Sequence, residues 1–338
     1  MSIMCWTNDK ILVRCVSFNG VKFREHLTRC SKRTDMIGTG QPCVELQAAP
    51  LVCAVVINWN RPDDTLLCLA SLRRQEGIFN LEPIVIDNGS SDNSVERIRN
   101  AFPGIELLEA GRNVGFASGM NLGIRQALKR GADYALLLNN DTIADPAMLD
   151  QLLKQAASGV GLMAPAIFYA DQPDRIWSVG GGFSSILLEA TGNHGRHRLL
   201  PDRPVERGFL SGCALLIHRE VFEKVGLFDE RFFMYYEDLD FCLRAQRAGY
   251  CLWLVPKARL WHKVSLSSGG ANSPAERYHM AFSSALYFRK YARGWRLFVV
   301  IPYRLMSALR WTVRLGVRGN WQSLSAYWRG LRDGLMEK

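Results

Sequence analysis

The sequence lacks any long apolar run. No stretch of its 338 residues reaches the roughly 18 consecutive apolar residues that a membrane-spanning helix needs. Its first residues also lack a positively charged start followed by an apolar region, which is the pattern of a secretory signal. Since 48% of the residues are hydrophobic, the chain can still bury a large core, as one big domain or a domain with appendages. These features predict a cytoplasmic protein.

Patterns typical of several protein classes are missing as well. The nine cysteines are an odd number and no two stand in CxxC spacing, so neither a zinc knuckle nor a disulfide framework is indicated. No GxGxxG pattern occurs, which argues against a dinucleotide-dependent dehydrogenase. Acids are scarce near the carboxyl end, where residues 275–338 hold 12 Lys and Arg against three acids, a net +9. Nearly all of the net charge of +10 therefore lies in that region.

This basic region interleaves arginines with tryptophans and other aromatic residues. Basic helices with an aromatic and aliphatic face bind anionic bilayers. We therefore expect residues 275–338 to form a basic amphipathic helical appendage that holds the protein peripherally at the inner face of the cell membrane. The structural alternative is a solvated helical surface whose aromatic side chains pack on the core. A nucleic-acid-binding tail is less favoured because no nucleic-acid module accompanies the charge, and no nucleic-acid partner is expected.

The rest of the chain divides into two regions. Residues 1–50 mix polar and apolar residues without a sustained period, which predicts a poorly specified N-terminal extension. From Leu51 onward, short apolar runs typical of buried strands alternate with helical patterns, as far as the run from Tyr134 to Leu138. Such alternation indicates an α/β fold with a mostly parallel central sheet flanked by helices. We expect residues 51–274 to form this domain.

Polar residues follow two of the predicted strands. The carboxyl ends of strands in an open α/β sheet form the edge where ligands bind. Asp87 lies at one such end and could accept a hydrogen bond from a nucleobase N–H group, although an Asx turn is the commoner explanation. Asn139-Asn140-Asp141 follows another strand, and Asp141 could hold a divalent metal ion against a diphosphate. A turn before a helix at Pro146 is its structural alternative.

A second acidic group opens a predicted helix that Gly249 ends. Glu237, Asp238 and Asp240 fall in the first turn, where the helix dipole favours acids for structural reasons alone. The mostly aromatic residues just before them predict an apolar wall beside a cleft, in which one of these acids could act as a general base. Further on, His262 follows a predicted strand and is compatible with a third metal ligand.

In their order, these motifs resemble the family 2 glycosyltransferases, and most of all the bacterial rhamnosyltransferase-like branch. The motifs are VVINWN at 55–60, IDNGSSD at 86–92, NVGFA at 113–117, LNND at 138–141, FDE and EDLD within 228–240, and WH at 261–262. The resemblance covers residues 51–290 in outline. Members of this family have a GT-A fold and invert the anomeric centre, so the resemblance implies a GT-A catalytic domain over residues 51–274.

The resemblance implies a role for each matched position. Asp238 matches the catalytic base, and Glu237 is its neighbour in the catalytic pair. Asp141 matches a ligand of Mg²⁺ or Mn²⁺ in a DxD-like motif, and His262 matches a histidine that can join the metal shell. Asn139 departs from the motif, since many relatives carry an acid there. The positions matched to donor binding are Asn58, Asp87, Asn113, Phe116, Asn121 and Asn140.

Together these matches imply an inverting glycosyltransferase that acts in the synthesis of cell-surface polysaccharide. It would move a sugar, with rhamnose as the leading expectation, from a dTDP- or UDP-sugar donor to a hydroxyl of a glycan or lipid-linked oligosaccharide. Two other classes stay open. A nucleotidyltransferase should show a basic glycine-rich phosphate loop near the first strand, which Asn58 to Arg61 lack. A non-catalytic protein that binds nucleotide sugars or carbohydrates would need no base.

Overall fold

The structure is a computed structural model that describes residues 5–7, 10–12, 48–192, 199–264 and 272–337. The chain divides into two units, residues 1–47 and 48–338. In the first unit the described residues form two short antiparallel strands, β1 (Cys5–Thr7) and β2 (Lys10–Leu12). The predicted N-terminal extension otherwise lies outside the described residues. The fold and the site below belong to the second unit.

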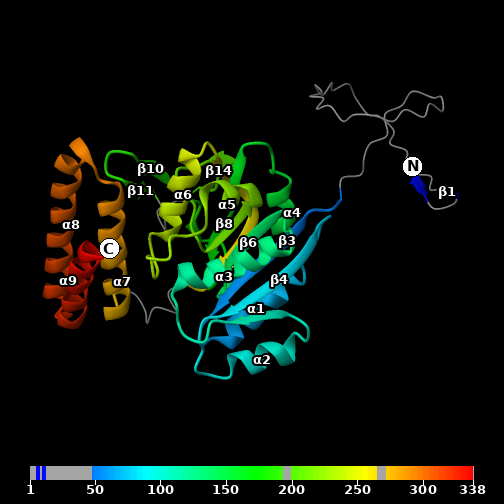
Figure 1. The fold of residues 1–338 in the computed structure, drawn as a ribbon, viewed down its shortest axis with the longest axis horizontal. Helices are drawn as coiled ribbons and strands as arrows, with labels where there is room; N and C mark the ends of the chain where they lie inside the picture. The colour runs from blue at the N-terminus through cyan, green and yellow to red at the C-terminus, as the bar shows by residue number, and fades with distance from the viewer. Residues whose placement is uncertain (1–4, 8–9, 13–47, 193–198, 265–271, 338) are drawn as a thin grey trace. The chain divides into compact units, whose positions relative to one another are not determined.

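A ten-stranded sheet forms the centre of the second unit (Figure 1). Its first half is parallel throughout, in the order β5-β4-β3-β6. These strands are β3 (Leu51–Asn58), β4 (Asn80–Asp87), β5 (Glu106–Glu109) and β6 (Tyr134–Asn139). Because they are parallel, the strands β3, β4 and β6 end at one edge of the sheet. Their last residues, Asn58, Asp87 and Asn139, are polar and are called the polar row below.

The second half of the sheet begins with β13 (Ala214–His218), which runs antiparallel to both of its neighbours, β6 and β8. β8 and β14 run parallel to each other, and β12 pairs antiparallel with β14 at the edge. The remaining strands of this half are β8 (Val160–Tyr169), β14 (Cys251–His262), β12 (Val205–Glu206), β7 (Thr142–Ala144) against β14, and β9 (Ile176–Ser178) against β8. A separate two-stranded sheet joins β10 (Gly182–Ser184) to β11 (Glu189–Thr191).

Helices cover both faces of the sheet because its strands are apolar on both sides. Alternate residues of β3 point to opposite faces, so that Val55 joins one core cluster and Val56 joins the other. The first cluster contains α3 (Phe116–Lys129), α5 (Arg219–Val225) and α6 (Glu237–Arg247). The second contains α1 (Pro62–Leu72), α2 (Ser94–Ala101) and α4 (Met148–Leu153).

Three further helices follow the sheet domain, with a short 3-10 turn between the first two (Figure 1). They are α7 (Pro274–Tyr291), α8 (Leu297–Val317) and α9 (Trp321–Met336). α7 and α9 approach closely at two glycines of α9, since a Cβ on Gly330 would lie 2.3 Å from the Tyr278 carbonyl oxygen. None of the helices in the described part of the chain is both long and apolar enough to cross a membrane.

The alternating strands and helices predicted between Leu51 and Asn139 are confirmed, as is the mostly parallel sheet. Two features differ from the prediction. β13 runs antiparallel in the middle of the sheet, and β7 lies where a simple turn was expected before Pro146, with α4 beginning only at Met148. β7 pairs with a strand more than a hundred residues later, and local residue patterns do not predict such a pairing. The boundary at residue 274 stays a prediction, because residues 48–338 form one unit.

Candidate active site

Asp87 lies at the end of β4 and is held by three hydrogen bonds. Its Oδ1 accepts from Asn58 Nδ2 at 2.9 Å and from the Ser90 hydroxyl at 2.5 Å, and its Oδ2 accepts from the Ser90 backbone N–H at 3.0 Å. The bonds from Ser90 realise the turn that the sequence favoured. They also fix the carboxylate in one orientation beside β3. A role in binding a nucleobase is compatible with this arrangement and stays a prediction.

Two of the residues predicted to contact the donor have their side-chain amides engaged within the protein. Asn58 is fully buried, and its amide is used within the protein: Nδ2 donates to Asp87, and Oδ1 accepts from the Thr65 hydroxyl at 2.6 Å. Asn121 is also fully buried, and its amide both donates to and accepts from the backbone of Phe228, at 2.9 and 3.0 Å. Neither side chain reaches the surface of the crevice. Asn58 therefore positions Asp87, and Asn121 clamps α3 to the segment before α6.

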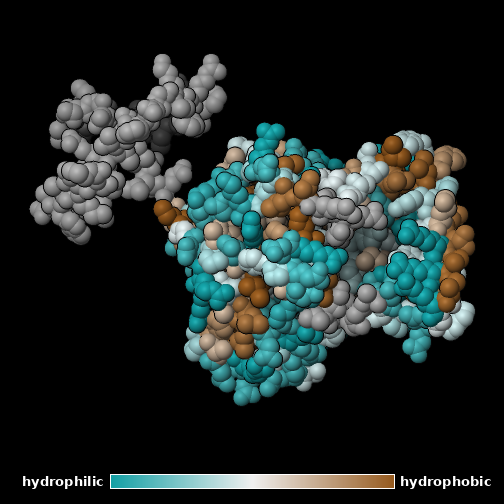
Figure 2. Space-filling model, turned by 180° about the vertical axis from the view of Figure 1, so that it is seen from behind, coloured by the Kyte–Doolittle hydropathy of each residue, from teal (hydrophilic) through white to brown (hydrophobic). Residues whose placement is uncertain are grey.

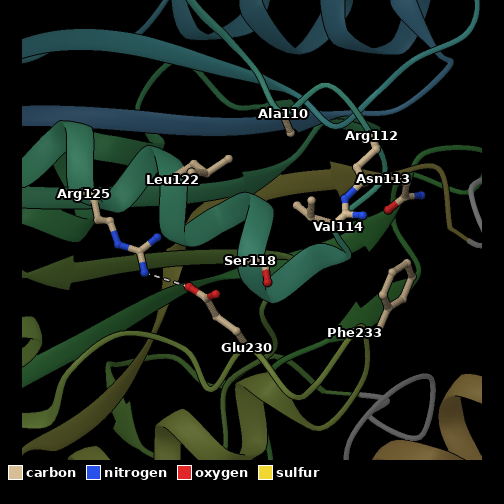
Figure 3. A pocket seen from close by; sticks show the side chains of 9 residues that line it. All are labelled: Ala110, Arg112, Asn113, Val114, Ser118, Leu122, Arg125, Glu230 and Phe233. Atoms are coloured by element: carbon tan, nitrogen blue, oxygen red, sulfur yellow. Dashed lines mark hydrogen bonds and ion pairs between the residues drawn. The ribbon is translucent and has the colours of Figure 1, made fainter.

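Asn113 lies in the loop that leads into α3, and Phe116 is the first residue of that helix. Asn113 lines a pocket of about 600 Å³ (Figure 3), whereas the Phe116 side chain packs against the first core cluster. The other residues that line this pocket are Ala110, Arg112, Val114, Ser118, Leu122, Arg125, Glu230 and Phe233. Between the two, Gly115 has a φ of +88°, and a Cβ there would lie 2.5 Å from the Phe233 carbonyl oxygen. Only glycine allows this loop to meet the segment before α6 so closely.

Asp141, which lies between β6 and β7, contacts His262, the last residue of β14. β7 and β14 pair so that Thr142 lies opposite His262, and the His262 Nε2 atom is 3.1 Å from Asp141 Oδ1. Both side chains are buried. Burial disfavours the imidazolium, but the Cys213 sulfur and the Asp141 carboxylate outweigh it and raise the pKa of His262 to about 10. The Asp141 carboxylate is the charge that would attract a cation here, and the His262 imidazole would have to give up its proton to become a ligand.

The donor atoms at this site fit a divalent metal whose shell is completed by a substrate. Among the described residues no cluster of three His, Cys, Asp or Glu side chains could hold a metal ion. The protein thus offers one carboxylate oxygen and one imidazole nitrogen. Mg²⁺ is typically held by one or two carboxylates together with substrate phosphates and water. The Asn139 Oδ1 atom is buried and meets no donor from the described residues, so it could accept from a bound ligand or water.

Asn140, which is predicted to bind the donor, is connected to Asp87 by a chain of hydrogen bonds. Its Nδ2 donates to the Thr65 hydroxyl at 2.9 Å, and that hydroxyl donates in turn to Asn58. Thr65 lies on α1 and is fully buried. The chain of bonds from Asn140 through Thr65 and Asn58 to Asp87 links the predicted metal motif to the predicted nucleobase contact.

Asp238 and Glu237 begin α6 and have different surroundings. Asp238 is partly exposed, and its two oxygens accept backbone N–H bonds from Gly212 at 2.9 Å and Leu239 at 2.8 Å. Burial raises the pKa of the Asp238 carboxyl, and these two hydrogen bonds oppose the rise. Glu237 is buried, and burial together with the neighbouring Asp238 charge raises the pKa of its carboxyl well above the ordinary range. Asp238 is therefore the carboxylate of the pair, and Glu237 holds its proton to higher pH.

The turn Ser211-Gly212-Cys213 connects the base motif to the metal motif, and the sequence patterns did not single it out. Gly212 donates to Asp238, and the next residue, Cys213, accepts the Asn139 N–H at 3.0 Å across the pairing of β13 with β6. Burial raises the pKa of the Cys213 thiol. The neighbouring His262 lowers this pKa, and the charges of Asp141 and Asp238 raise it. The structure therefore brings the predicted metal ligands and the predicted base to opposite sides of one short turn. Its only sequence signal is a small residue before the apolar run of β13.

A family model for glycosyl transferase family 2 matches residues 53–226, slightly more than half of the chain. The chain belongs to glycosyl transferase family 2. One relative is the N-acetylglucosaminyl-diphospho-decaprenol L-rhamnosyltransferase of Mycobacterium tuberculosis, 30% identical over 68% of this chain and 79% of the relative. Another is the dTDP-rhamnosyl transferase RfbF of Shigella flexneri, 23% identical over 71% of this chain and 80% of the relative.

The fold of this glycosyltransferase also resembles solved structures. The mannosyltransferase PcManGT from Pyrobaculum calidifontis, in complex with GDP-Man and Mn²⁺, superposes with a TM-score of 0.52 at 16% identity over 86% of this chain and 76% of that one. The predicted GT-A fold and family are thereby confirmed. The protein is an enzyme of the glycosyltransferase class, so a nucleotidyltransferase and a non-catalytic binding protein are both set aside.

The C-terminal helices of the glycosyltransferase contact the segment that carries the predicted base, Asp238. The fully buried Asp240, two residues after Asp238, accepts from Lys290 at 2.6 Å and from the Tyr291 hydroxyl at 2.6 Å, both on α7. The Tyr236 hydroxyl donates to Glu189 at 3.0 Å, and Arg304 of α8 lies 3.4 Å from the same carboxylate. α7 and α8 therefore hold both ends of the base motif.

The segment just before the base has an unusual backbone. Tyr235 and Tyr236 are consecutive residues with φ values of +68° and +67°, a region that side-chain-bearing residues rarely adopt. Two such residues in a row cost on the order of 1–3 kcal/mol each. Surrounding contacts must offset this cost, and the Tyr236 bond to Glu189 is one of them. The strained pair lies directly before Glu237, the first residue of α6, and one residue further from Asp238.

Replacing Gly212 with alanine should displace the predicted base, Asp238, without removing it. A Cβ at this position would lie 3.2 Å from Asp238 Cβ, which is tighter than most real Cβ contacts, so the Asp238 side chain would have to move by a few tenths of an ångström. We expect kcat to fall about tenfold, the equivalent of about 1.4 kcal/mol, while the affinity for the donor changes little. Steady-state kinetics and calorimetry measure the two quantities. Gly316→Ala is the matched control, because a Cβ at Gly316 would meet nothing within 4 Å; equal losses in both variants would contradict the assignment.

Proposed function

We propose that this glycosyltransferase moves rhamnose from a dTDP-rhamnose donor to a hydroxyl of a lipid-linked glycan, with inversion at the sugar C1. The observation that carries the proposal is the turn around Gly212, which has the Asp238 carboxylate on one side and the Asp141–His262 pair on the other. The relatives named for rhamnosyl transfer support the sugar, and the mycobacterial relative is named for a diphospho-decaprenol acceptor.

The donor would lie along the polar row at the ends of the parallel strands. Asp87 would accept the imide N–H of thymine or uracil, since its carboxylate is already fixed by Asn58 and Ser90. Asp141 and His262 would hold a divalent cation. When bound, that cation supplies positive charge that stabilises the departing nucleoside diphosphate. Which ion is used belongs to the proposal, as does the dTDP rather than UDP donor.

The acceptor would approach from the side of α6. Asp238 takes the proton of the acceptor hydroxyl, and the freed oxygen attacks C1 on the face opposite the diphosphate. One C–O bond forms as the C1–diphosphate bond breaks, so the configuration inverts in a single displacement. Burial and the neighbouring Asp238 charge raise the pKa of the Glu237 carboxyl, which disfavours its ionised form. Backbone N–H donors on both Asp238 oxygens fix the carboxylate without neutralising it.

A panel of nucleotide sugars tests the proposal directly. We expect dTDP-rhamnose to raise the melting temperature of the protein and to be hydrolysed slowly in the absence of acceptor, in both cases more with Mn²⁺ or Mg²⁺ than with a chelator. UDP-glucose and GDP-mannose, which differ from dTDP-rhamnose in nucleobase and in sugar, serve as controls for the choice of donor. Stabilisation by a different nucleotide sugar would overturn the choice of donor, and the same stabilisation with chelator would overturn the role of the metal. The predicted cytoplasmic, membrane-associated location is part of this proposal, because a lipid-linked acceptor is confined to a membrane.

A further inference from the structure

One face of α8 exposes a continuous stripe of large apolar side chains. Its members follow one another at spacings of three or four residues, which places them on one side of a helix. They are Phe298, Ile301, Leu305, Leu309, Val313 and Val317, each more than half exposed and reaching 85% at Phe298. Figure 2 shows hydrophobic surface running down the outer edge of the C-terminal helices. Soluble surfaces rarely carry so long an apolar patch without a partner.

The opposite side of α8 packs on the rest of the protein through a small number of residues. Only Val300, Ala308 and Leu315 of this 21-residue helix are buried. Ala308 and Leu315 pack with Ala281 of α7 and Tyr327 of α9 in a small cluster separate from the two main cores. Among the described residues the stripe takes no part in a core cluster, so its exposure needs another explanation.

Arginines border the stripe, and acids are absent. Arg310, Arg314 and Arg318 each follow a stripe residue by one position, about 100° round the helix. No Asp or Glu occurs between Glu276 and Asp333. Tryptophans mark both ends of α8, since Trp295 precedes it and Trp321 follows it, and each is at least 60% exposed. Basic borders and terminal tryptophans around an apolar face are typical of helices that lie in the headgroup region of a bilayer.

We propose that α8 docks on an anionic lipid bilayer, with the stripe inserted among the acyl chains and the bordering arginines on lipid phosphates. A second copy of the chain is a worse occupant. Two stripes packed on each other would bring the arginines of both helices together, and α8 has no carboxylate to pair with them. A membrane supplies both the apolar phase and the negative charge. The proposal rests on the proposed function only in giving the reason for docking, which is a lipid-linked acceptor.

The docked helix would lie close to the chemistry. Arg304 precedes the stripe residue Leu305 and points the other way, to Glu189 and to the Ser284 hydroxyl at 2.7 Å. Glu189 accepts from Tyr236, which directly precedes the base motif. Two side-chain contacts thus connect the membrane-facing helix to the residues beside Asp238. An acceptor anchored in the bilayer would meet the base without leaving the membrane surface.

Vesicle sedimentation of the full chain tests the docking surface without donor or acceptor. We expect the protein to sediment with phosphatidylcholine vesicles that contain phosphatidylglycerol, and far less with phosphatidylcholine alone. The double variant Leu305→Gln, Leu309→Gln should weaken binding by at least about tenfold. Arg310→Gln with Arg314→Gln should weaken it about fivefold for each arginine removed. Both pairs are exposed, so the melting temperature should stay that of the wild type.

The matched control is Leu67→Gln with Ile78→Gln, a pair of exposed apolar residues on the catalytic domain. This control should bind vesicles as the wild type does. A wild type that stays in the supernatant with anionic vesicles would overturn the proposal. So would a control that loses binding as the stripe variant does, or light scattering that shows a dimer which the stripe variant dissociates. Because the assay contains no sugar donor, failure here would leave the proposed rhamnosyl transfer standing, and failure of transfer would leave vesicle binding intact.

Discussion

Asp238→Asn is expected to lower kcat by about 10²–10⁴-fold, the range that a positioned general base contributes, while the affinity for the nucleotide sugar changes less than about twofold. Asparagine keeps the size of the side chain and one oxygen for the N–H groups of Gly212 and Leu239. It cannot take a proton from the acceptor hydroxyl. Single-turnover transfer and calorimetric binding of the donor measure the two effects separately.

The pH dependence of the wild type should reveal the same group. Only the ionised form of Asp238 accepts a proton, and burial raises the pKa of its carboxyl. Activity should therefore fall as the pH drops through this raised pKa and recover as the pH rises. The acid limb of kcat/KM reports this titration. The limb should be absent from the residual activity of Asp238→Asn.

Glu237→Gln is the matched control for this experiment. Glu237 is the immediate neighbour of Asp238, and burial together with the charge of Asp238 raises the pKa of its carboxyl, which favours the protonated form. Glutamine is nearly isosteric with a protonated glutamate, so this variant should keep kcat within about threefold. If both variants lost activity equally, or if Asp238→Asn lost donor affinity in parallel with kcat, Asp238 would be structural and not the base.

The sequence predicted the elements of this site better than their contacts. Asp87 and Asp141 follow buried strands, and the ends of such strands form a common edge in any parallel sheet. Their placement therefore followed from local patterns alone. Asn58 and Asn121 show the limit of that reasoning. Both are polar residues beside the predicted crevice, yet both are buried by partners 29 and 107 residues away in the chain. Only the tertiary structure tells a ligand contact from an internal clamp.

The contact of Asp141 with His262 shows the same limit. It depends on the short strand β7, whose three residues pair with β14 far along the chain. Nothing in the residues Thr142 to Ala144 indicates that partner. The brace from Arg304 through Glu189 to Tyr236 likewise joins segments separated by up to 115 residues. Hydrophobic pattern predicts which face of an element is buried, but it leaves open which charged groups meet across the interface.

Asp141→Ala is expected to weaken metal-dependent binding of a nucleoside diphosphate by about 100-fold or more, because even second-shell changes at metal sites cost 10–100-fold in metal affinity. Alanine removes the one carboxylate oxygen that faces His262 Nε2 at 3.1 Å. Titration of dTDP with Mn²⁺ and with a chelator measures the loss. Asp174→Ala, at an exposed acid of the same type, is the control and should bind dTDP like the wild type.

A double-mutant cycle with His262→Ala decides whether the two residues hold the same ion. If they do, the second substitution should cost little once the first has removed metal binding, so the double variant should bind dTDP about as weakly as Asp141→Ala alone. If the losses in dTDP affinity from the two substitutions add, the two side chains do not hold the same ion. The wild type could also bind dTDP equally well with Mn²⁺ and with chelator. In that case binding would rest on Asp87 and the polar row alone. Asp141 would then serve only to fix the orientation of the His262 imidazole beside Trp177.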